Sequence, residues 1–450
     1  MKTAIVLFNR DLRVHDHPAL MAAAREAESV VPVFVFDEAI LGSAFARPNR
    51  VAFLLEALSD LDAALAQRGS RLLTRRGDVV RETFRLAEET GAEAIFTSAD
   101  VSAYAQARER RIAAAAHGAR VELRLCPGVT VVAPGDVVTS EGSRFSVFTP
   151  YFRQWSHAPR RALEQAPQRL RTPTTPAKGA LPTLSALVSR DAAPGRARGG
   201  EPAARRRMTS WLRSGLAHYE ELHDNLAADR TSRLSPYLHF GCVSPLELAE
   251  RAAKAAVGAA FVRQLCWRDF YAQLLDARPE TSTEDMRSRG DRWSVDGQQL
   301  EAWKRGLTGY PVVDAGMRQL LHEGYMHNRA RLITASFLTK DLYVDWREGA
   351  RHYYDHLTDG DVANNAGNWQ WVAGTGADTR PNRVFNPTRQ ARRFDPEGEY
   401  VRRYVPELAE VEGGVVHEPW SLGLLRPSDY PDPVVDHADA AAAFKARRSR

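Results

Sequence analysis

The chain has 450 residues, of which 44% are apolar and 26% are charged. This balance is typical of a soluble globular protein and excludes a mostly disordered one, and the length favours two domains. The formal net charge is only +5, from 61 basic and 56 acidic residues. Charge alone therefore does not identify a polyanionic partner.

The cysteines and the amino-terminal residues indicate the cellular compartment. Cys126, Cys242 and Cys266 lie far apart and form no C-x-x-C pair, so one chain cannot build a disulfide framework or a four-thiolate iron–sulfur site. Arg10 and Asp11 interrupt the apolar start of the chain early, and no apolar run is long enough to cross a bilayer. We expect a soluble, cytoplasmic protein that does not contact a membrane.

Residues 3–125 alternate short β-branched or apolar runs with stretches of helical period. The runs that read as strands are 5–8, 30–36, 71–74, 94–97 and 121–125. Near-continuous apolar strands joined by helical crossovers predict an α/β domain over residues 1–128, with a doubly wound parallel sheet covered on both faces. Any ligand is expected at the carboxyl ends of the strands, although no glycine-rich dinucleotide or triphosphate loop follows the first strand.

The composition changes twice after the predicted sheet. Between residues 129 and 207 it shifts to Pro, Gly, Ala and Arg, for example in 172–176 (TPTTP), which predicts an interdomain connector. From Met208 the pattern becomes helical, and Ser235 and Ser244 each stand before a proline, as capping hydroxyls do at helix starts. We expect an all-α domain over 208–410 and a Pro-rich carboxyl-terminal tail over 411–450.

Three short segments contain residues with possible functional roles. The charged, turn-prone segment 8–20 (FNRDLRVHDHPAL) follows the first predicted strand. Residues 230–241 (RTSRLSPYLHFG) bring hydroxyls and arginines to a helix start, which are the donors that a pyrophosphate requires. In 263–271 (RQLCWRDFY), Gln264, Trp267 and Tyr271 share one helical face beside arginines, which predicts either a packed core or a stacking platform for an unstacked base.

A fourth group of segments gives the most specific pattern. It consists of 309–311 (GYP), 326–331 (MHNRAR), 340–347 (KDLYVDWR) and 359–371 (DGDVANNAGNWQW). The order, spacing and residue types of all these segments resemble the photolyase/cryptochrome family, in particular class I dimer photolyases, over residues 5–408. His17 departs from the asparagine that is more usual at its position. Each residue alone also has a structural explanation, such as a helix cap, a buried ion pair or a core aromatic side chain.

This resemblance implies an FAD cofactor in the helical domain. The implied cofactor-binding residues are Tyr219, Thr231, Ser232, Arg233, Leu234, Ser235, Gln264, Trp267, Arg268, Asn328, Arg331, Asp359, Asp361 and Asn365. Arg331 is expected to form an ion pair with Asp359, and the amide of Asn365 to hydrogen-bond N5 of the flavin without adding negative charge.

The activity implied is that of a carbon–carbon lyase, deoxyribodipyrimidine photo-lyase. In this family, photoexcited reduced FAD gives an electron to a cyclobutane pyrimidine dimer, the ring opens and the electron returns, so that no metal, general acid or nucleophile is needed. Gln264, Asn328 and Asn365 are the implied catalytic residues. Trp369, Trp346 and Trp293 are the implied electron-hopping series between the flavin and the surface.

DNA carrying pyrimidine dimers is the implied partner. A dimer must leave the duplex to reach a buried flavin, and a disrupted base pair costs less to unstack than an intact one. The implied DNA- and lesion-binding residues are Gln264, Trp267, Arg268, Tyr271, Asn328, Arg329, Leu332, Trp371 and Arg383. Arginines of the segment 380–393 would hold the flanking phosphates, which makes binding salt-dependent. We expect a monomer that is nucleoid-associated when bound to DNA.

Two departures lie where the lesion should bind. Dimer photolyases carry an acidic residue at the position of Gln264 and a methionine at that of Leu332. Because glutamine also occurs there in animal (6-4) photolyases and in cryptochromes, a (6-4) photolyase and a cryptochrome-like blue-light photoreceptor are alternatives. The (6-4) enzymes, however, have histidines where this chain has Asn328 and Leu332, and photoreceptors typically append a longer tail. A plain FAD oxidoreductase would need a dinucleotide fingerprint, which the sequence lacks.

For the α/β domain the resemblance implies an antenna chromophore held against the sheet. The implied surroundings are Phe34, Phe36, Asp37, Leu41, Arg50, Phe53 and Asp100. An 8-hydroxy-5-deazaflavin is favoured, while a folate, FMN or another second flavin, and an empty site, are left open.

Overall fold

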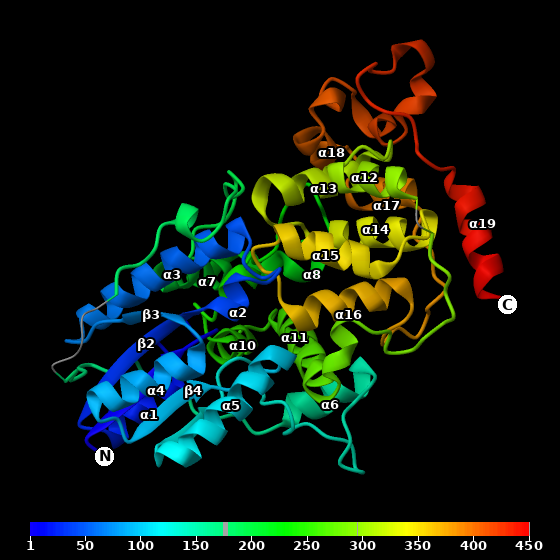
Figure 1. The fold of residues 1–450 in the computed structure, drawn as a ribbon. Helices are drawn as coiled ribbons and strands as arrows, with labels where there is room; N and C mark the ends of the chain where they lie inside the picture. The colour runs from blue at the N-terminus through cyan, green and yellow to red at the C-terminus, as the bar shows by residue number, and fades with distance from the viewer. Residues whose placement is uncertain (174–178, 295, 450) are drawn as a thin grey trace.

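The computed structural model describes residues 1–173, 179–294 and 296–449. Figure 1 shows an α/β part in blue and cyan next to a helical part in green, yellow and orange. The described residues form one five-stranded parallel sheet in the order β3-β2-β1-β4-β5. The strands are β1 (Thr3–Phe8), β2 (Ser29–Asp37), β3 (Leu73–Gly77), β4 (Ala94–Ser98) and β5 (Glu122–Cys126). The predicted doubly wound sheet is confirmed.

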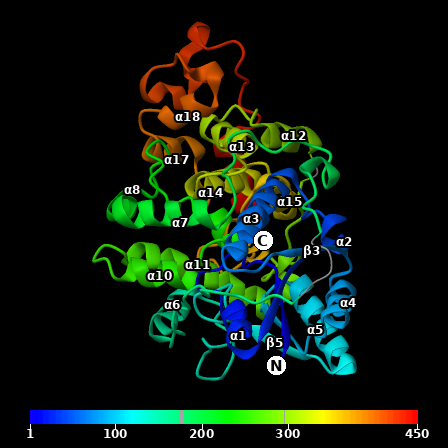
Figure 2. The ribbon, with the colours of Figure 1, turned by 90° about the vertical axis from the view of Figure 1, so that its left-hand side faces the viewer.

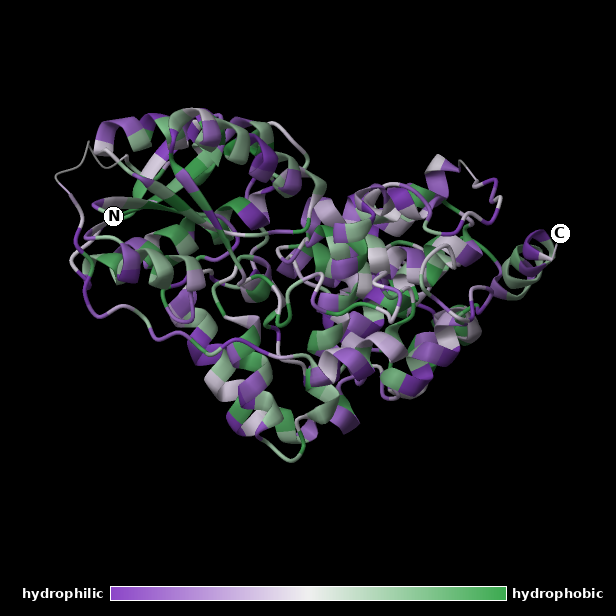
Figure 3. Cartoon of the chain, turned by 90° about the horizontal axis from the view of Figure 1, so that it is seen from below, coloured by the Kyte–Doolittle hydropathy of each residue, from purple (hydrophilic) through white to green (hydrophobic). Residues whose placement is uncertain are grey.

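The side chains of β1 alternate between two apolar cores. Ala4, Val6 and Phe8 belong to one core cluster, and Ile5 and Leu7 to another. Because successive side chains of a strand point to opposite faces, these cores lie on the two sides of the sheet. The helices around the sheet are α1 (Pro18–Glu26), α2 (Glu38–Leu41), α3 (Pro48–Ala66), α4 (Val79–Thr90) and α5 (Ala103–Ala119). In Figure 3 the strands are mostly green, which marks them as apolar, while the helices around them carry both colours.

The third strand differs from its prediction. It begins at Leu73 and ends at Gly77, whereas the sequence pattern indicated 71–74. The reason is that the Leu72 amide donates to the Asp62 carboxylate over 3.0 Å, which takes this residue out of the strand pairing that begins with Val33 and Leu73.

The segment 129–207, predicted as an interdomain connector, contains helices α6 (Phe148–His157) and α7 (Glu201–Ser210) and a 3-10 turn, η1 (Leu184–Ala186). Phe148, Tyr151 and Trp155 are buried on α6, and their spacing of three and four is that of an apolar helical stripe. Residues 174–176 of the proline-rich stretch lie outside the described residues.

The helical part follows α7. Its helices are α8 (Tyr219–Leu222), α9 (Ser235–His239), α10 (Pro245–Ala253), α11 (Ala259–Ala277), α12 (Gly297–Arg305), α13 (Pro311–Glu323), α14 (Asn328–Ser336), α15 (Trp346–His356), α16 (Val362–Ala373), α17 (Pro387–Phe394) and α18 (Glu399–Tyr404). Ser244 caps α10 as expected, because its side chain accepts from the Glu247 amide. The expectation for Ser235 is wrong: this residue is the first of α9, which has no side-chain cap. Among the described residues, no helix is long and apolar enough to span a bilayer.

The last forty residues contain more structure than a proline-rich tail. They end in α19 (His437–Arg448), the red helix in Figure 1. Phe444 of α19 is buried, and the Arg448 guanidinium donates to both carboxylate oxygens of Asp291 over 2.7 and 2.6 Å. These contacts fix α19 to the helical part.

The two parts meet along the carboxyl ends of the strands. There the buried Arg50 guanidinium of α3 donates to the carbonyls of Tyr354 and Leu357, at the carboxyl end of α15; both helices are labelled in Figure 2. The amide of Leu12, which follows β1, donates to the Phe240 carbonyl over 3.1 Å. The first two candidate segments of the sequence, 8–20 and 230–241, are therefore in direct contact.

Candidate functional site

A cavity of about 420 Å³ lies in the helical part. Ligand pockets in proteins have volumes of about 300–1,000 Å³, so this cavity is large enough for a cofactor or a substrate. The expected site residues that line it are Tyr219, Thr231, Ser232, Arg233, Leu234, Ser235, Gln264, Trp267, Arg268, Tyr271, Asn328, Arg329, Arg331, Leu332, Asp359, Asp361 and Trp371. Segments that are distant in the sequence thus converge on one site.

Asn365 lies beside this cavity in a smaller one of about 70 Å³. Its buried amide donates to the Ala350 carbonyl over 3.0 Å. Asn364 and Asn368 line both cavities, whereas Asn365 was the only asparagine of α16 expected in the site. The spacing of four between Asn364 and Asn368 could have identified this second amide face.

The expected ion pair between Arg331 and Asp359 is present. The Nη2 atom of Arg331 donates to both carboxylate oxygens over 2.9 and 3.1 Å, and its Nε donates to the Met326 carbonyl over 2.8 Å. Burial alone would lower the pKa of Arg331, but the Asp359 carboxylate raises it above its ordinary value. The cavity therefore has a permanent positive charge that is fixed in place.

Asp361 is connected to the α/β part. Its Oδ2 lies 2.5 Å from Nη2 of Arg10, while Nη1 of the same guanidinium lies 3.1 Å from Oδ1 of Asp100. Burial alone would raise the pKa of Asp361, but Arg10 and other cationic neighbours hold it well below its ordinary value. Next to it, burial lowers the pKa of His239, so this imidazole is neutral at pH 7. The sequence did not indicate that Arg10 belongs to the site, because its partners are distant in the chain.

Hydroxyls and arginines gather at one end of the cavity. The Arg233 guanidinium lies 2.6 Å from Asp229 and 2.8 Å from Glu323, and its central carbon is 4.6 Å from the ring centroid of Tyr325. The hydroxyls of Tyr325 and Thr231 are 3.2 Å apart. Since α9 has only five residues, the polar groups at this end of the cavity are these side chains and not a helix N-terminus. Tyr325 was not predicted from the sequence and lies just before the segment 326–331.

One face of α11 contributes an aromatic surface. Trp267 and Tyr271 line the cavity, and Gln264 is exposed at its mouth. The ring centroids of Trp267 and Tyr271 are 5.6 Å apart. Behind Trp267, Phe148 of α6 stacks on the indole, a contact that joins the segment predicted as connector to the site.

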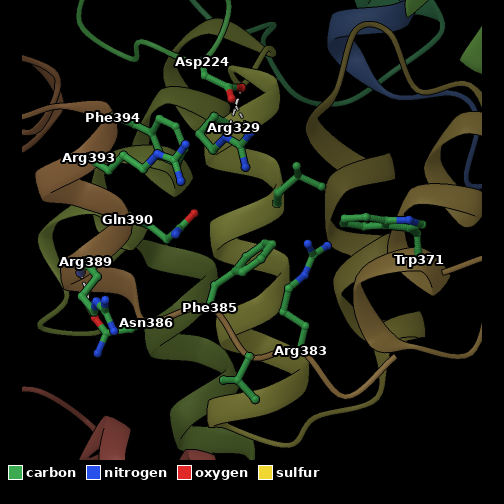
Figure 4. A pocket seen from close by; sticks show the side chains of 12 residues that line it. Asp224, Arg329, Trp371, Arg383, Phe385, Asn386, Arg389, Gln390, Arg393 and Phe394 are labelled. Carbon is green, nitrogen blue, oxygen red and sulfur yellow. Dashed lines mark hydrogen bonds and ion pairs between the residues drawn. The ribbon is translucent and has the colours of Figure 1, made fainter. Parts of the chain in front are cut away.

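An open groove of about 750 Å³ adjoins the cavity, with which it shares Asp224, Arg329, Leu332 and Trp371. Figure 4 shows Arg383 between Trp371 and Phe385. Its guanidinium carbon is 4.9 Å and 5.1 Å from the two ring centroids. α17 contributes Arg389 and Arg393 to the same groove. Arg383 therefore lies outside the main cavity, in a surface that suits a polyanion.

The three tryptophans of the implied hopping series belong to one region. Trp369 and Trp346 are buried in the same core cluster, and the half-buried Trp293 packs against it. The indole Nε1 of Trp346 donates to Asp285 over 2.8 Å. The Trp369 ring contacts Tyr353, with centroids 4.9 Å apart. Of the three indoles only that of Trp293 is partly exposed, so it alone could connect the series to the surface.

The positions implied for an antenna lie near the carboxyl ends of the strands. Asp37 ends β2 and accepts from the Ala39 amide over 3.0 Å, and Asp100 pairs with Arg10. Arg50 is buried among backbone carbonyls, and the Phe53 ring stacks on Phe240 with centroids 4.9 Å apart. Phe36 is buried, while Phe34 and Leu41 are partly exposed. Several of these side chains thus hold the two parts together, and their antenna role stays a prediction.

Comparison with known proteins identifies the family. Residues 4–172 match the family described as DNA photolyase, and residues 261–450 match the FAD binding domain of DNA photolyase. A deoxyribodipyrimidine photo-lyase of Streptomyces griseus is 56% identical over 454 residues, which cover 100% of this chain and 99% of that protein. The chain belongs to the photolyase/cryptochrome family.

Solved structures agree with this assignment. A bacterial class III photolyase from Agrobacterium tumefaciens superimposes with a TM-score of 0.94 at 33% identity, over 100% of this chain and 97% of that one. An archaeal photolyase from Sulfolobus tokodaii, solved with two FAD molecules, gives a TM-score of 0.89 at 30% identity, over 99% of each chain.

Among the described residues, no group of three His, Cys, Asp or Glu side chains could hold a metal ion.

Proposed function

We propose that this protein is a deoxyribodipyrimidine photo-lyase that splits cyclobutane pyrimidine dimers in DNA under light. The observation that carries the proposal is the cavity itself, in which the expected cofactor and lesion residues converge beside an arginine-lined groove. The similarity to the Streptomyces griseus photo-lyase over the full chain supports the same activity.

FAD would occupy the cavity, and the residues present fit it. The hydroxyls of Thr231 and Ser232 suit a pyrophosphate, beside an Arg233 guanidinium that Asp229 and Glu323 hold in place. The carboxylate of Asp361 can accept from an N–H group of the flavin ring. His239 also lines the cavity, and its buried Nδ1, which lies 3.9 Å from the Asp361 carboxylate, makes no hydrogen bond among the described residues, so it could bond to a polar group of the cofactor. When bound and reduced, FAD supplies on absorbing blue light the electron that opens the cyclobutane ring and that later returns.

The side chains at the mouth would bind the lesion. The half-buried Trp267 offers a π face on which an everted pyrimidine can stack, a contact worth about 1–3 kcal/mol per base, and the buried Tyr271 lies beside it. The exposed amide of Gln264 can accept from pyrimidine N3–H and donate to O4, which replaces the acidic residue of other dimer photolyases. Asn328 and Leu332 would contact the dimer from α14, where a histidine pair would be needed for (6-4) chemistry.

The surrounding arginines would hold the DNA. Arg329, Arg383 and the arginines of α17 line the groove next to the cavity, so they suit the phosphates that flank an everted dimer. We propose that the protein acts in the cytoplasm as a monomer and becomes nucleoid-associated through these contacts.

Two further roles complete the proposal. Trp369, Trp346 and Trp293 would deliver electrons from the surface to restore the reduced cofactor, and the partial exposure of Trp293 supports this direction. A second chromophore would lie near Phe36, Asp37, Arg50 and Asp100, with 8-hydroxy-5-deazaflavin favoured over a folate or FMN. The Sulfolobus tokodaii relative, which was solved with two FAD molecules, keeps a second flavin as an alternative.

The test uses purified holoenzyme with chemically reduced flavin and two oligonucleotides, one with a single cyclobutane dimer and one with a (6-4) lesion. We expect loss of the cyclobutane dimer under blue light only, with the (6-4) lesion unchanged in light and dark. Equal dimer content in illuminated and dark samples would instead favour a photoreceptor. Repair of the (6-4) lesion alone would identify a (6-4) photolyase.

A further inference from the structure

The indole of Trp267 belongs to a column of aromatic rings. Its centroid lies 3.7 Å from that of Phe148, and the two ring planes differ by 4°. Phe148 stacks in turn on Phe152, with centroids 5.8 Å apart and planes differing by 17°. The Arg263 guanidinium carbon lies 5.0 Å and 4.9 Å from these two phenylalanine rings. α6 and α11, which are more than one hundred residues apart in the sequence, form this column together.

The column leaves one face of Trp267 free for a ligand. Trp267 lines the cavity and Phe148 does not, so Phe148 covers the indole face that is turned away from the cavity. Phe148 itself is buried and also contacts Phe270 edge-on, with centroids 5.7 Å apart. Its ring therefore has little room to move.

A buried polar contact holds α6 in place behind Trp267. Trp155 Nε1 donates to Oδ2 of Asp269 over 2.9 Å, and the amides of Val131 and Val132 donate to the same oxygen over 2.9 and 3.0 Å. Asp269 follows Trp267 by two residues on α11. The helix that carries Phe148 is thereby fixed to the helix that carries Trp267.

We propose that Phe148 is a positioning residue for lesion recognition, which holds the Trp267 indole in the plane that receives an everted pyrimidine. This inference rests on the proposed function, since it requires Trp267 to stack on the lesion. An indole supported on its far face loses less side-chain freedom when a base stacks on the other face. An aromatic pair also contributes beyond the area that it buries.

The test compares ring-less and ring-bearing variants of the holoenzyme in the dark. Phe148→Leu and Phe148→Met keep an apolar side chain without a π face, and Phe148→Tyr keeps the ring. Phe152→Leu is the matched control, because Phe152 lies on α6 and stacks on Phe148 and Trp155 but not on Trp267. The readout is the ratio of the dissociation constants for undamaged DNA and for the same oligonucleotide with one cyclobutane dimer.

We expect this ratio to fall about three- to tenfold in both ring-less variants. In Phe148→Tyr and Phe152→Leu the ratio should keep its wild-type value. Flavin photoreduction without DNA should keep its rate, since Phe148 lies in a different core cluster from Trp369 and Trp346. A wild-type ratio in either ring-less variant, or an equal loss in Phe152→Leu, overturns the role of Phe148 alone. A wild-type protein that does not discriminate damaged from undamaged DNA overturns the proposed function as well.

Discussion

Substitution of Arg10 by glutamine tests the contact between the α/β part and the cavity. Arg10 follows β1, and its guanidinium lies 3.1 Å from Asp100 and 2.5 Å from Asp361, while its Nε donates to the His239 carbonyl over 3.0 Å. Arg10→Gln removes the cation and leaves two carboxylates with little exposure facing each other across the interface.

The cost follows from the geometry. At the 3.1 Å between Arg10 and Asp100, two unit charges attract by about 5 kcal/mol at an effective dielectric constant of about 20. Desolvation offsets most of this attraction in the intact pair, but removal of one partner leaves the other buried and unpaired, which costs about 3–5 kcal/mol. We therefore expect Arg10→Gln to lower the free energy of unfolding by about 3–5 kcal/mol at pH 7.

The assay is urea unfolding followed by far-ultraviolet circular dichroism, with Arg25→Gln as control. Arg25 forms an ion pair with Glu164 over 2.9 Å, and its side chain is 57% exposed, so its loss should cost less than about 1 kcal/mol. Equal destabilisation by the two substitutions would refute the reasoning.

The pH dependence gives a second check on the same pair. Burial alone would raise the pKa of Asp361, but Arg10, His239 and Arg268 together outweigh burial, and the net pKa lies well below the ordinary value. A carboxylate with a lowered folded-state pKa adds stability above its unfolded pKa, near about 4, and this stability is lost as the pH falls through the folded value. The difference in the free energy of unfolding between wild type and Arg10→Gln should thus be largest near pH 7 and shrink below about pH 4.

Three further substitutions test other parts of the molecule. Burial lowers the pKa of the Lys340 ammonium to about 7, so Lys340→Met should raise the free energy of unfolding measured in urea at pH 6. This gain in stability should shrink as the pH rises toward the ordinary lysine pKa. A gain in stability that does not change with pH would contradict the prediction. Trp369→Phe should slow photoreduction of oxidised flavin, measured by absorbance, and leave repair by pre-reduced enzyme at the wild-type rate; loss of both would contradict the hopping role. Arg389→Gln should weaken binding to damaged and undamaged DNA alike and reduce the slope of log K against log salt by about 0.9; an unchanged slope would place the phosphates elsewhere.

Local patterns were sufficient to predict the sheet and most of the cavity. Strands such as β1 and β2 are continuous apolar runs whose burial on both faces is encoded in their own residues. The cavity residues were found because they lie within segments that resemble a family. The domain boundaries and the class within the family stay predictions.

The structures that the sequence did not reveal depend on partners far along the chain. α6 and α19 are short helices in Pro- or Ala-rich surroundings, so composition predicted a connector and a tail, although Phe148 and Phe444 are buried. Tyr325 belongs to the site through its contacts with Arg233 and Thr231. Such contacts join residues separated by about ninety positions, so the local periodicity of the sequence cannot predict them.

The segment that follows β1 contributes to the cavity as well as to the α/β part. Gly241 has a φ of +66°, and a Cβ there would lie 2.0 Å from the carbonyl oxygen of Arg10, so only glycine permits this approach of the two backbones. The approach lets Arg10 reach Asp361, and the Arg13 guanidinium donates to the Gly241 carbonyl over 2.9 Å. The sheet therefore supplies one of the charges that set the electrostatics of the cavity, and the α/β part contributes to the proposed chemistry even when no antenna chromophore is bound.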